Sequence, residues 1–286
     1  MAEPLARESR PGVMVFAVTG DLGLAGALWL EASEVLRGGC IGRHSCADLC
    51  LPYEETLSLR HLLVLTRRDG ARTRVRVLDL RSEDGLFDER GERAGELETD
   101  GPLVVGAAGW WFFLFPTGEE RPWRLDALKP WETLTPRVFS RHDSHASRLE
   151  LQSCTRRDVT LVGRAAGPVS IAQGSLVEGA ELPAGTLQLS CGGGELSVSV
   201  GAHALERGVL LGRDTRCDGS SILGDQRISR VHALLVRSPT GRVVLFDLGS
   251  TNGTHSNGQE RRMLPVDSQS VSLAEVATVR WSPRAQ

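Results

Sequence analysis

The chain contains one ordered pattern of features twice, in residues 39–115 and 208–282. Each copy has an apolar residue followed by Gly-Arg, then Ser-x-x-His, then two apolar runs separated by a turn, the second ending in Asp-Leu. A polar turn and two further apolar segments follow in both copies. Because the apolar runs have the length of strands and are separated by Gly, Asp, Asn and Ser, we expect each copy to form an antiparallel β-sandwich.

Upstream segments extend both copies. VMVFAVTGDLG precedes the first, and TLQLSCGGGELSVSV precedes the second, with Gly192-Gly193-Gly194 as a hairpin turn. A chain of 286 residues is long enough for two such domains. The sequence therefore predicts an all-β protein with domains at 11–116 and 184–284, joined by a partly β-structured linker at 117–183.

The charge balance argues against a nucleic-acid partner. Lys and Arg together number 33 and Asp and Glu 36, which gives a net charge of -3 and no basic excess. Residues 13–30 are mostly apolar and follow Arg7 and Arg10, as in a signal peptide or a membrane span. Asp21 and the surrounding glycines instead favour two strands around a turn, so we expect no membrane insertion.

Six cysteines are too few for a disulfide scaffold and suggest reduced thiols and a cytoplasmic protein. The densest group, Cys40, His44, Cys46 and Cys50, has zinc-type ligands but no Cys-x-x-Cys pair. Buried free thiols are the preferred interpretation, with a metal-binding regulator as the alternative. No metal, other cofactor or catalytic residue is predicted.

The motifs of the second copy point to a family. Gly212-Arg213, Ser229-x-x-His232 and the block Asp247 to Thr254 (DLGSTNGT), in this order, resemble the forkhead-associated (FHA) domain. The resemblance implies a β-sandwich whose loops at one end bind a phosphothreonine peptide. It assigns peptide contacts to Arg213, Ser229, Arg230, Thr251 and Asn252.

The chemistry of these residues suits the expected ligand. Phosphothreonine carries nearly two negative charges, so its pocket needs a permanently cationic forked donor, which Arg213 supplies, together with hydroxyl and amide donors. By resemblance, the Ser229 hydroxyl donates to a phosphate oxygen, and Thr251 or the backbone beside Arg230 completes the cradle. The Asn252 amide can both donate to and accept from a peptide main chain.

Other residues of these motifs are expected to shape the loops. Gly212 and Gly253 permit unusual backbone geometry, and His232 braces the loops by hydrogen bonding. The residue types of a hydrolase triad are also present, as Ser229, His232 and Asp247. No Gly-x-Ser-x-Gly motif accompanies them, so a triad is not the preferred interpretation.

The first copy keeps Arg43 and Ser58 but has Glu83-Asp84 in place of Thr251-Asn252. Two carboxylates facing a phosphate would repel it by on the order of 4 kcal/mol each at about 4 Å and moderate dielectric. We therefore expect a folded FHA-like sandwich with a degenerate site at Arg43 and Ser58. The aromatic run 110–113 is interpreted as a buried strand, with an exposed partner site as the alternative.

Two threonines of the linker, Thr135 and Thr155, are weighed as internal ligands if phosphorylated. The leading hypothesis is a non-enzymatic adaptor of Ser/Thr kinase signalling. Its partner would be a phosphothreonine-containing protein, either a Ser/Thr kinase or the substrate of one. The alternative is a phosphate-independent structural scaffold or dimerisation protein, which Arg213→Ala would separate from a phosphate reader.

Overall fold

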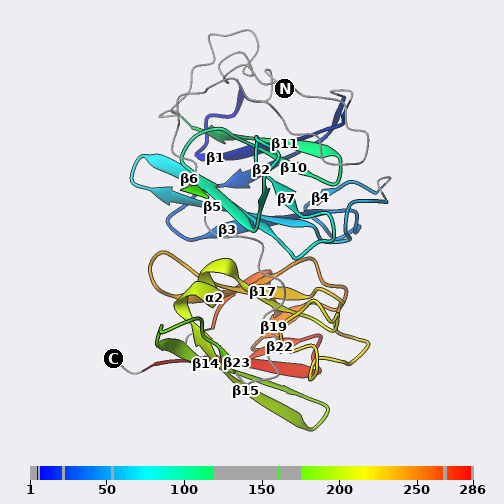
Figure 1. Ribbon diagram of the computed structural model, residues 1–286, viewed down its shortest axis with the longest axis vertical. Helices are drawn as coiled ribbons and strands as arrows, with labels where there is room; N and C mark the ends of the chain where they lie inside the picture. Colours follow the sequence, from blue (N-terminus) through cyan, green and yellow to red (C-terminus); the bar gives the residue numbers. More distant parts are fainter. Residues whose placement is uncertain are drawn as a thin grey trace. The chain divides into compact units, whose positions relative to one another are not determined.

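The computed structural model describes residues 5, 7–20, 23–52, 55–118, 160–161, 175–266 and 269–284. The chain divides into two units, residues 1–165 and 166–286. Each unit consists of two β-sheets, and we refer to the units as the first and the second sandwich (Figure 1).

The strands of the first sandwich are β1 (Gly12–Val18), β2 (Leu24–Glu31), β3 (Arg37–Gly42), β4 (Leu49–Cys50), β5 (Leu62–Asp69), β6 (Arg72–Asp79), β7 (Leu86–Phe87), β8 (Arg93–Ala94), β9 (Glu96–Thr99), β10 (Leu103–Ala107), β11 (Trp110–Thr117) and β12 (Thr160–Leu161). Sheet A has the order β2-β1-β11-β10-β7-β8, and sheet B has the order β12-β9-β6-β5-β3-β4. Figure 1 shows β1, β10 and β11 stacked over β3, β5 and β6.

Apolar side chains cover both faces of sheet A. The core between the sheets takes alternate residues of β1 and β11, namely Val13, Val15, Ala17, Phe112 and Leu114. The intervening residues of β1 and β11 point to the outer face of sheet A and form a second buried cluster there with residues of other segments. Its members are Leu5, Met14, Phe16, Val18, Val104, Phe113 and Phe115. Strands buried on both faces have continuous apolar sequences. The aromatic run 110–113 therefore lies in a buried strand, as predicted.

Residues 13–18 and 24–30 lie in the antiparallel pair of β1 and β2, in which Phe16 lies opposite Ala27. The two strands predicted for this segment are therefore present. Among the described residues, no helix is both long and apolar enough to cross a bilayer.

The second sandwich contains β13 (Ser175–Leu176), β14 (Pro183–Cys191), β15 (Gly194–Gly201), α2 (Ala202–Arg207), β16 (Val209–Leu211), β17 (Ala233–Arg237), β18 (Val243–Asp247), β19 (Thr254–Ser256), β20 (Gln259–Glu260), β21 (Met263–Pro265), β22 (Val271–Leu273) and β23 (Ala277–Pro283). Sheet C has the order β13-β15-β14-β23-β22-β19-β20, and sheet D has the order β16-β17-β18-β21. The predicted turn between β14 and β15 is present, with φ of 58° at Gly192 and 84° at Gly193. A core of alternating apolar residues fills the space between the sheets.

The two sandwiches have equivalent strand orders. In sheet C, β15-β14-β23-β22-β19-β20 repeats the order of sheet A, and in sheet D, β16-β17-β18-β21 repeats β3-β5-β6-β9 of sheet B. Residues of the predicted linker add one strand to each unit, because β12 pairs with β9 and β13 pairs with β15. The structure thus confirms the all-β class, the two sandwiches and the strand character within the linker.

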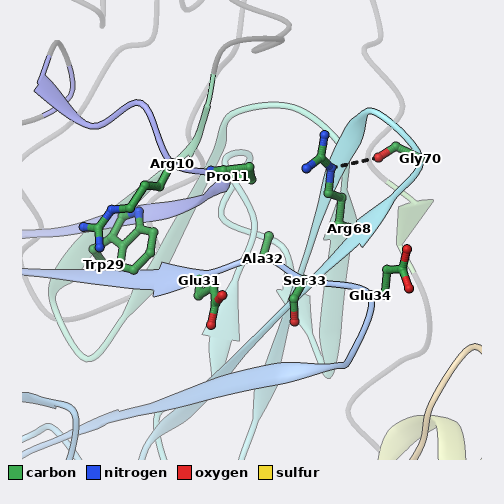
Figure 2. A pocket seen from close by; sticks show the side chains of 9 residues that line it. All are labelled: Arg10, Pro11, Trp29, Glu31, Ala32, Ser33, Glu34, Arg68 and Gly70. Carbon is green, nitrogen blue, oxygen red and sulfur yellow. Dashed lines mark hydrogen bonds between the residues drawn. The ribbon is translucent and has the colours of Figure 1, made fainter.

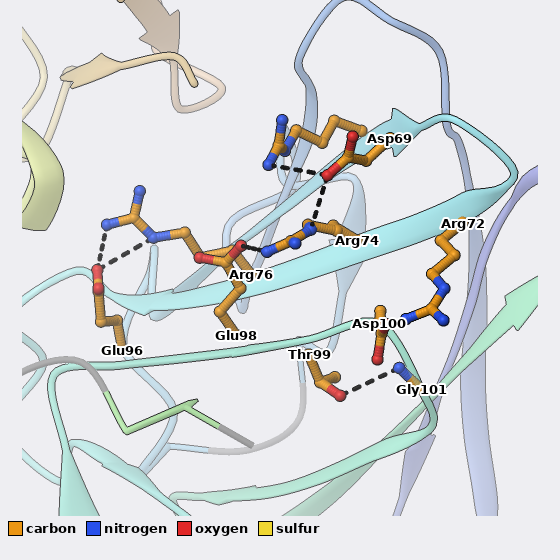
Figure 3. A network of polar contacts seen from close by, with 10 residues as sticks. Asp69, Arg72, Arg74, Arg76, Glu96, Glu98, Thr99, Asp100 and Gly101 are labelled. Carbon is orange, nitrogen blue, oxygen red and sulfur yellow. Dashed lines mark hydrogen bonds and ion pairs between the residues drawn. The ribbon is translucent and has the colours of Figure 1, made fainter. Parts of the chain in front are cut away.

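A ladder of ion pairs lies on β5, β6, β9 and the residue after β9 (Figure 3). Arg74 contacts Asp69 at 3.1 Å and Glu98 at 3.4 Å, and Arg72 contacts Asp100 at 2.7 Å. The pair Arg76–Glu96 is the most enclosed of the ladder, with 16% and 2% of the two side chains exposed.

A hollow of about 750 Å³ lies where β2 ends, beside the turn from β5 to β6. Its lining includes Arg10, Trp29, Glu31 and Arg68, and Figure 2 shows the Arg10 guanidinium stacked on the Trp29 ring. The distance from the guanidinium carbon to the ring centroid is 4.1 Å. The lining residues Glu31–Glu34 come just before β3 begins at Arg37, whereas Arg43 follows the last residue of β3, Gly42. The hollow and the loop that carries Arg43 therefore lie at opposite ends of the first sandwich.

Candidate functional site

Arg213 lies just beyond the end of β16 and is fixed by two hydrogen bonds. Its backbone N–H donates to the Ser229 carbonyl at 3.2 Å, and its side-chain Nε donates to the Ile228 carbonyl at 2.9 Å. The side chain is exposed, and its two Nη groups have no partner among the described residues. The guanidinium is therefore anchored at Nε and presents its fork to solvent.

Gly212 allows the backbone before Arg213 to approach the Ser229–Arg230 loop closely. A Cβ atom at Gly212 would lie 2.2 Å from the Arg230 carbonyl oxygen, which is far inside van der Waals contact. Asp214 donates its backbone N–H to the same carbonyl at 3.0 Å. Only glycine permits this close approach, and the approach places Arg213 beside Ser229.

His232 is fully buried and holds the loop from behind. Its Nδ1 accepts the Ser229 backbone N–H at 3.2 Å, and its Nε2 lies 3.2 Å from the Gly253 carbonyl. Since a carbonyl can only accept, Nε2 carries the proton and Nδ1 is the acceptor, which assigns the neutral tautomer. The imidazole thereby braces both the Ser229 loop and the turn after β18.

Asp247, at the end of β18, organises the turn that carries Thr251 and Asn252. Its Oδ1 accepts the Ser250 backbone N–H at 2.7 Å, and its Oδ2 accepts the hydroxyls of Ser250 and Thr254, both at 2.6 Å. All three polar side chains are buried. Ser250 and Thr254 were not singled out from the sequence, although both belong to the DLGSTNGT block.

Two hydrogen bonds tie this turn to the Ser229 loop. The Thr251 backbone N–H donates to Ser229 Oγ at 3.1 Å, and the Asn252 Nδ2 donates to the Arg227 carbonyl at 2.8 Å. Ser229 Oγ thus receives one proton and keeps its own O–H. The Asn252 amide is partly used within the chain, and its Oδ1 has no partner among the described residues.

The loops around Ser229 carry four arginines with different partners. Arg216 and Arg227 pair with Asp214 at 3.1 Å and Asp225 at 2.8 Å. The hydrogen bond from the Arg227 side chain lowers the pKa of Asp225 to about 2. Arg213 forms no ion pair with any described residue, and its exposed side chain is held by the carbonyl of Ile228, the residue before Ser229.

Arg230 influences the second carboxylate of these loops. Burial alone would raise the pKa of Asp214, but hydrogen bonds from Arg216 and the charge of Arg230 lower it overall. Arg230 itself is exposed. The structure therefore brings Arg213, Ser229, Arg230, Thr251 and Asn252 together on adjoining loops at one end of the second sandwich.

Residues 209–281 match the sequence profile of the FHA domain. The second sandwich contains an FHA domain. The match begins with β16, ends within β23 and includes the loops that carry Arg213, Ser229, Thr251 and Asn252.

Solved structures of FHA domains are similar to parts of this chain. Rv1747 FHA-1 from Mycobacterium tuberculosis is 27% identical over 35% of this chain and 99% of its own, with a TM-score of 0.28. The FHA domain of CT664 from Chlamydia trachomatis is 19% identical over 36% of this chain and 96% of its own, with a TM-score of 0.30. Mycobacterium tuberculosis EmbR, in complex with a low-affinity phosphopeptide, is 21% identical over 35% of this chain and 26% of its own, with a TM-score of 0.28. The chain has no significant sequence match among curated proteins.

The geometry of the FHA domain does not match a hydrolase triad. His232 Nδ1 accepts the backbone N–H of Ser229, and its Nε2 contacts Gly253 while lying 3.7 Å from Asp247. No ring nitrogen is placed to take the proton of the Ser229 hydroxyl, which a triad requires.

The first sandwich repeats the frame of the FHA domain. Arg43 donates its backbone N–H to the Ser58 carbonyl at 3.2 Å, and His61 Nδ1 accepts the Ser58 N–H at 3.2 Å. His61 Nε2 lies 3.0 Å from the Gly85 carbonyl. A Cβ at Gly42 would lie 2.3 Å from the Leu59 carbonyl oxygen, so this position requires glycine, as position 212 does in the second sandwich.

The turn after β6 differs from its counterpart in the FHA domain. Glu83 and Asp84 are exposed, and in the described part of the chain neither forms a hydrogen bond to the Ser58 loop. The Glu83 carbonyl instead accepts from Arg93 at 3.1 Å. Leu86 replaces Thr254, so Asp79 has one hydroxyl donor fewer, and burial raises the pKa of Asp79. The first sandwich therefore keeps the cation, the hydroxyl and the histidine brace, but none of the contacts of the described residues corresponds to the bonds that Thr251 and Asn252 make to the opposite loop.

The cysteine cluster has structural partners. Cys40 is buried, His44 Nδ1 accepts the Cys46 backbone N–H at 3.1 Å, and Cys50 Sγ lies 3.8 Å from the Arg43 carbonyl. Among the described residues, no group of three or more His, Cys, Asp or Glu side chains is arranged to hold a metal ion. Thr135 and Thr155, weighed as internal ligands, lie outside the described residues.

Proposed function

We propose that this protein is a phosphothreonine-dependent adaptor of Ser/Thr kinase signalling and that its FHA domain binds the phosphopeptide. The observation that carries the proposal is the juxtaposition of Arg213 and Ser229. The Arg213 guanidinium is anchored at Nε by the Ile228 carbonyl with its fork exposed, and the next residue, Ser229, has a hydroxyl that already accepts one hydrogen bond and keeps its proton. Charge-assisted forked donors with a neighbouring hydroxyl suit a phosphate dianion.

The remaining loop residues extend the site to the peptide main chain. Asn252 Oδ1 is free to accept a peptide N–H, and Thr251 lies between Asn252 and the Ser229 hydroxyl. Arg230 adds positive charge at the edge of the site. The partner is a protein that displays phosphothreonine, either a Ser/Thr kinase or a substrate of one.

The test is calorimetric titration of the full chain with an oriented phosphothreonine peptide library and its unphosphorylated counterpart. Arg213→Ala removes the cationic fork and is expected to weaken binding about ten- to hundredfold, because hydrogen bonds to charged groups contribute roughly 1.5–3 kcal/mol each. Arg43→Ala removes the equivalent cation of the first sandwich and serves as the matched control. We expect it to leave the affinity unchanged.

Three outcomes would overturn the proposal. Binding that does not require the phosphate would favour a phosphate-independent scaffold. Equal losses of peptide affinity in Arg213→Ala and Arg43→Ala would mean that the FHA domain is not the specific binding site of the phosphopeptide. A loss in Arg43→Ala alone would move the phosphate site to the first sandwich.

A further inference from the structure

The turn after β18 has a neighbouring segment on each side, because β18 lies between β17 and β21 in sheet D. On the β17 side, hydrogen bonds from Thr251 and Asn252 connect the turn to the Ser229 loop. On the β21 side, the Asp247 backbone N–H donates to the Arg262 carbonyl at 2.8 Å, which places segment 260–262 along the turn. Side chains of both segments therefore border the turn that carries Thr251 and Asn252.

Both neighbouring segments carry exposed arginines. Arg230 is exposed on the Ser229 loop, and Arg261 and Arg262 are exposed on segment 260–262. The Arg230 side chain forms no hydrogen bond or ion pair with a described residue, and the Arg261 side chain donates to the uncharged amide of Gln259. Positive charge thus borders the turn on both sides.

The nearby carboxylates do not balance these cations. Two aspartates of the surrounding loops are already paired with Arg216 and Arg227. Among the described residues around the turn, the exposed carboxylates without an arginine partner are Glu260 and Glu275, and the exposed arginines without a carboxylate partner include Arg213, Arg230 and Arg261. The whole chain has a net charge of -3, so this local excess of cations does not follow from overall composition.

The first sandwich shows that the fold does not require arginines at these places. The residues that correspond to Arg230, Arg261 and Arg262 are Leu59, Ala94 and Gly95, and none of them is charged. The correspondence follows from the backbone, because the Gly95 carbonyl accepts the Asp79 N–H at 2.9 Å, as the Arg262 carbonyl accepts that of Asp247. The three arginines are therefore a feature of the FHA domain alone and are not needed to build its loops.

We propose that the FHA domain prefers phosphothreonine peptides with acidic residues beside the phosphothreonine, and that Arg230, Arg261 and Arg262 bind their carboxylates. This inference rests on the proposed function, because it takes the phosphothreonine to be held at Arg213 and Ser229. An extended peptide rises about 3.3 Å per residue, so three residues on each side of the phosphothreonine span about 10 Å. Guanidinium groups pair with carboxylates through charge-assisted hydrogen bonds. The phosphothreonine of the partner thus lies in an acidic segment.

Calorimetric titration of the full chain with three phosphothreonine peptides tests the preference. The peptides carry alanine, aspartate or lysine at three positions on each side of the phosphothreonine and are otherwise identical. We expect the aspartate peptide to bind about five- to twentyfold more tightly than the alanine peptide, since one exposed ion pair contributes a factor of up to about five. The lysine peptide should bind more weakly than the alanine peptide. Salt should reduce these differences, because it screens exposed charges.

Arg261→Gln/Arg262→Gln tests whether segment 260–262 sets the preference. We expect the ratio of the affinities for the aspartate and alanine peptides to fall about threefold or more, and Arg230→Gln should lower the same ratio. Arg237→Gln/Arg242→Gln is the matched control, because it removes two exposed arginines at the opposite end of sheet D, where β17 ends and β18 begins. It changes the net charge equally and should keep the ratio. Circular dichroism establishes that the variants are folded.

The preference is overturned if the aspartate peptide binds no more tightly than the alanine or the lysine peptide. It is also overturned if the ratio survives in Arg261→Gln/Arg262→Gln, or if the control variant loses it to the same extent, which would assign the effect to overall charge. In each of these cases, binding of the alanine peptide that requires both the phosphate and Arg213 would leave the proposed function intact. If no phosphorylated peptide binds more tightly than its unphosphorylated form, the proposed function fails, and the preference fails with it.

Discussion

The side-chain amide of Asn252 donates to the backbone carbonyl of Arg227 at 2.8 Å, and this bond ties the turn after β18 to the loop before β17. The counterpart of Asn252 in the first sandwich is Asp84, whose carboxylate cannot donate a hydrogen bond at neutral pH. The two sandwiches have the same frame of Gly, Ser, His and Asp. They differ in the bonds that Thr251 and Asn252 add between the two loops, which have no counterpart among the described contacts of Glu83 and Asp84.

Asn252→Asp replaces the residue that donates this hydrogen bond with the residue found at the same position of the first sandwich. The variant loses the bond to Arg227 and adds a negative charge beside the proposed phosphate position. We expect the affinity for a phosphothreonine peptide to fall about tenfold or more, since a lost tie and a repulsive charge together contribute roughly 1.4 kcal/mol or more. Calorimetric titration of the full chain measures the change.

Asn257→Asp is the control for the added charge. Asn257 is exposed at the turn between β19 and β20 with φ of 52°, a conformation that aspartate tolerates nearly as well as asparagine. This variant should keep its affinity. An equal loss in both variants would show that overall charge, and not the tie to Arg227, sets the affinity.

Gly212→Ala tests the close approach of the Arg213 segment to the Ser229 loop. The added methyl group would lie 2.2 Å from the Arg230 carbonyl, so the loop must move. Overpacking of this kind costs about 1–3 kcal/mol of unfolding free energy. Denaturant unfolding and peptide titration should both detect the change, with weaker binding as the second readout.

Gly224→Ala provides the comparison, because a Cβ at Gly224 meets nothing within 4 Å. We expect its stability and peptide affinity to remain close to those of the unmodified chain. If Gly212→Ala were as well tolerated as Gly224→Ala, the glycine would be dispensable and the close approach would have no role in the site.

The strands and the site loops could be predicted because the signals are local. Runs such as residues 110–115 and 243–246 are continuously apolar, and they form β11 and β18, which are buried over nearly their whole length. The order of Gly-Arg, Ser-x-x-His and the DLGSTNGT block indicated which loops meet. The boundaries 11–116 and 184–284 and the roles of Arg213, Ser229, Arg230, Thr251 and Asn252 remain predictions.

Pairings between distant segments left no local signal. β12 and β13 each have 2 residues, and their positions depend on backbone bonds to β9 and β15. The bond from Asn252 to Arg227 likewise spans 25 residues and connects a side chain to a backbone oxygen, which any residue supplies. The place of β2 at the end of the strand order of sheet A could be recognised only in the structure.

Glu96→Gln tests the most enclosed member of the ion-pair ladder in Figure 3. Arg76 and Glu96 have 16% and 2% of their side chains exposed, so the substitution removes a negative charge that contacts a poorly solvated guanidinium. Breaking such a pair costs roughly 3–5 kcal/mol. Thermal unfolding should show the loss in the transition of the first sandwich.

Asp100→Asn removes an exposed member of the same ladder. Its pair with Arg72 has 36% and 76% of the two side chains exposed, and pairs of this kind contribute about 0–1 kcal/mol. A similar loss of stability in both variants would contradict the importance of burial for the Arg76–Glu96 pair.

The pair Asp225–Arg227 predicts how the Ser229 loop responds to acid. The hydrogen bond from Arg227 lowers the pKa of Asp225 from 3.8 to about 2. The pKa of Asp225 is lower in the folded state than in the unfolded chain. The contribution of this carboxylate to loop order is therefore complete above pH 3.8 and is lost as the pH falls toward 2. Carboxyl chemical shifts followed by nuclear magnetic resonance should show that Asp225 is largely ionised at about pH 3. In Arg227→Ala, the titration midpoint of Asp225 should move up toward the usual value for aspartate. A midpoint that is already at the usual value in the unmodified chain, or one that Arg227→Ala does not change, would mean that the pair does not hold the loop in solution.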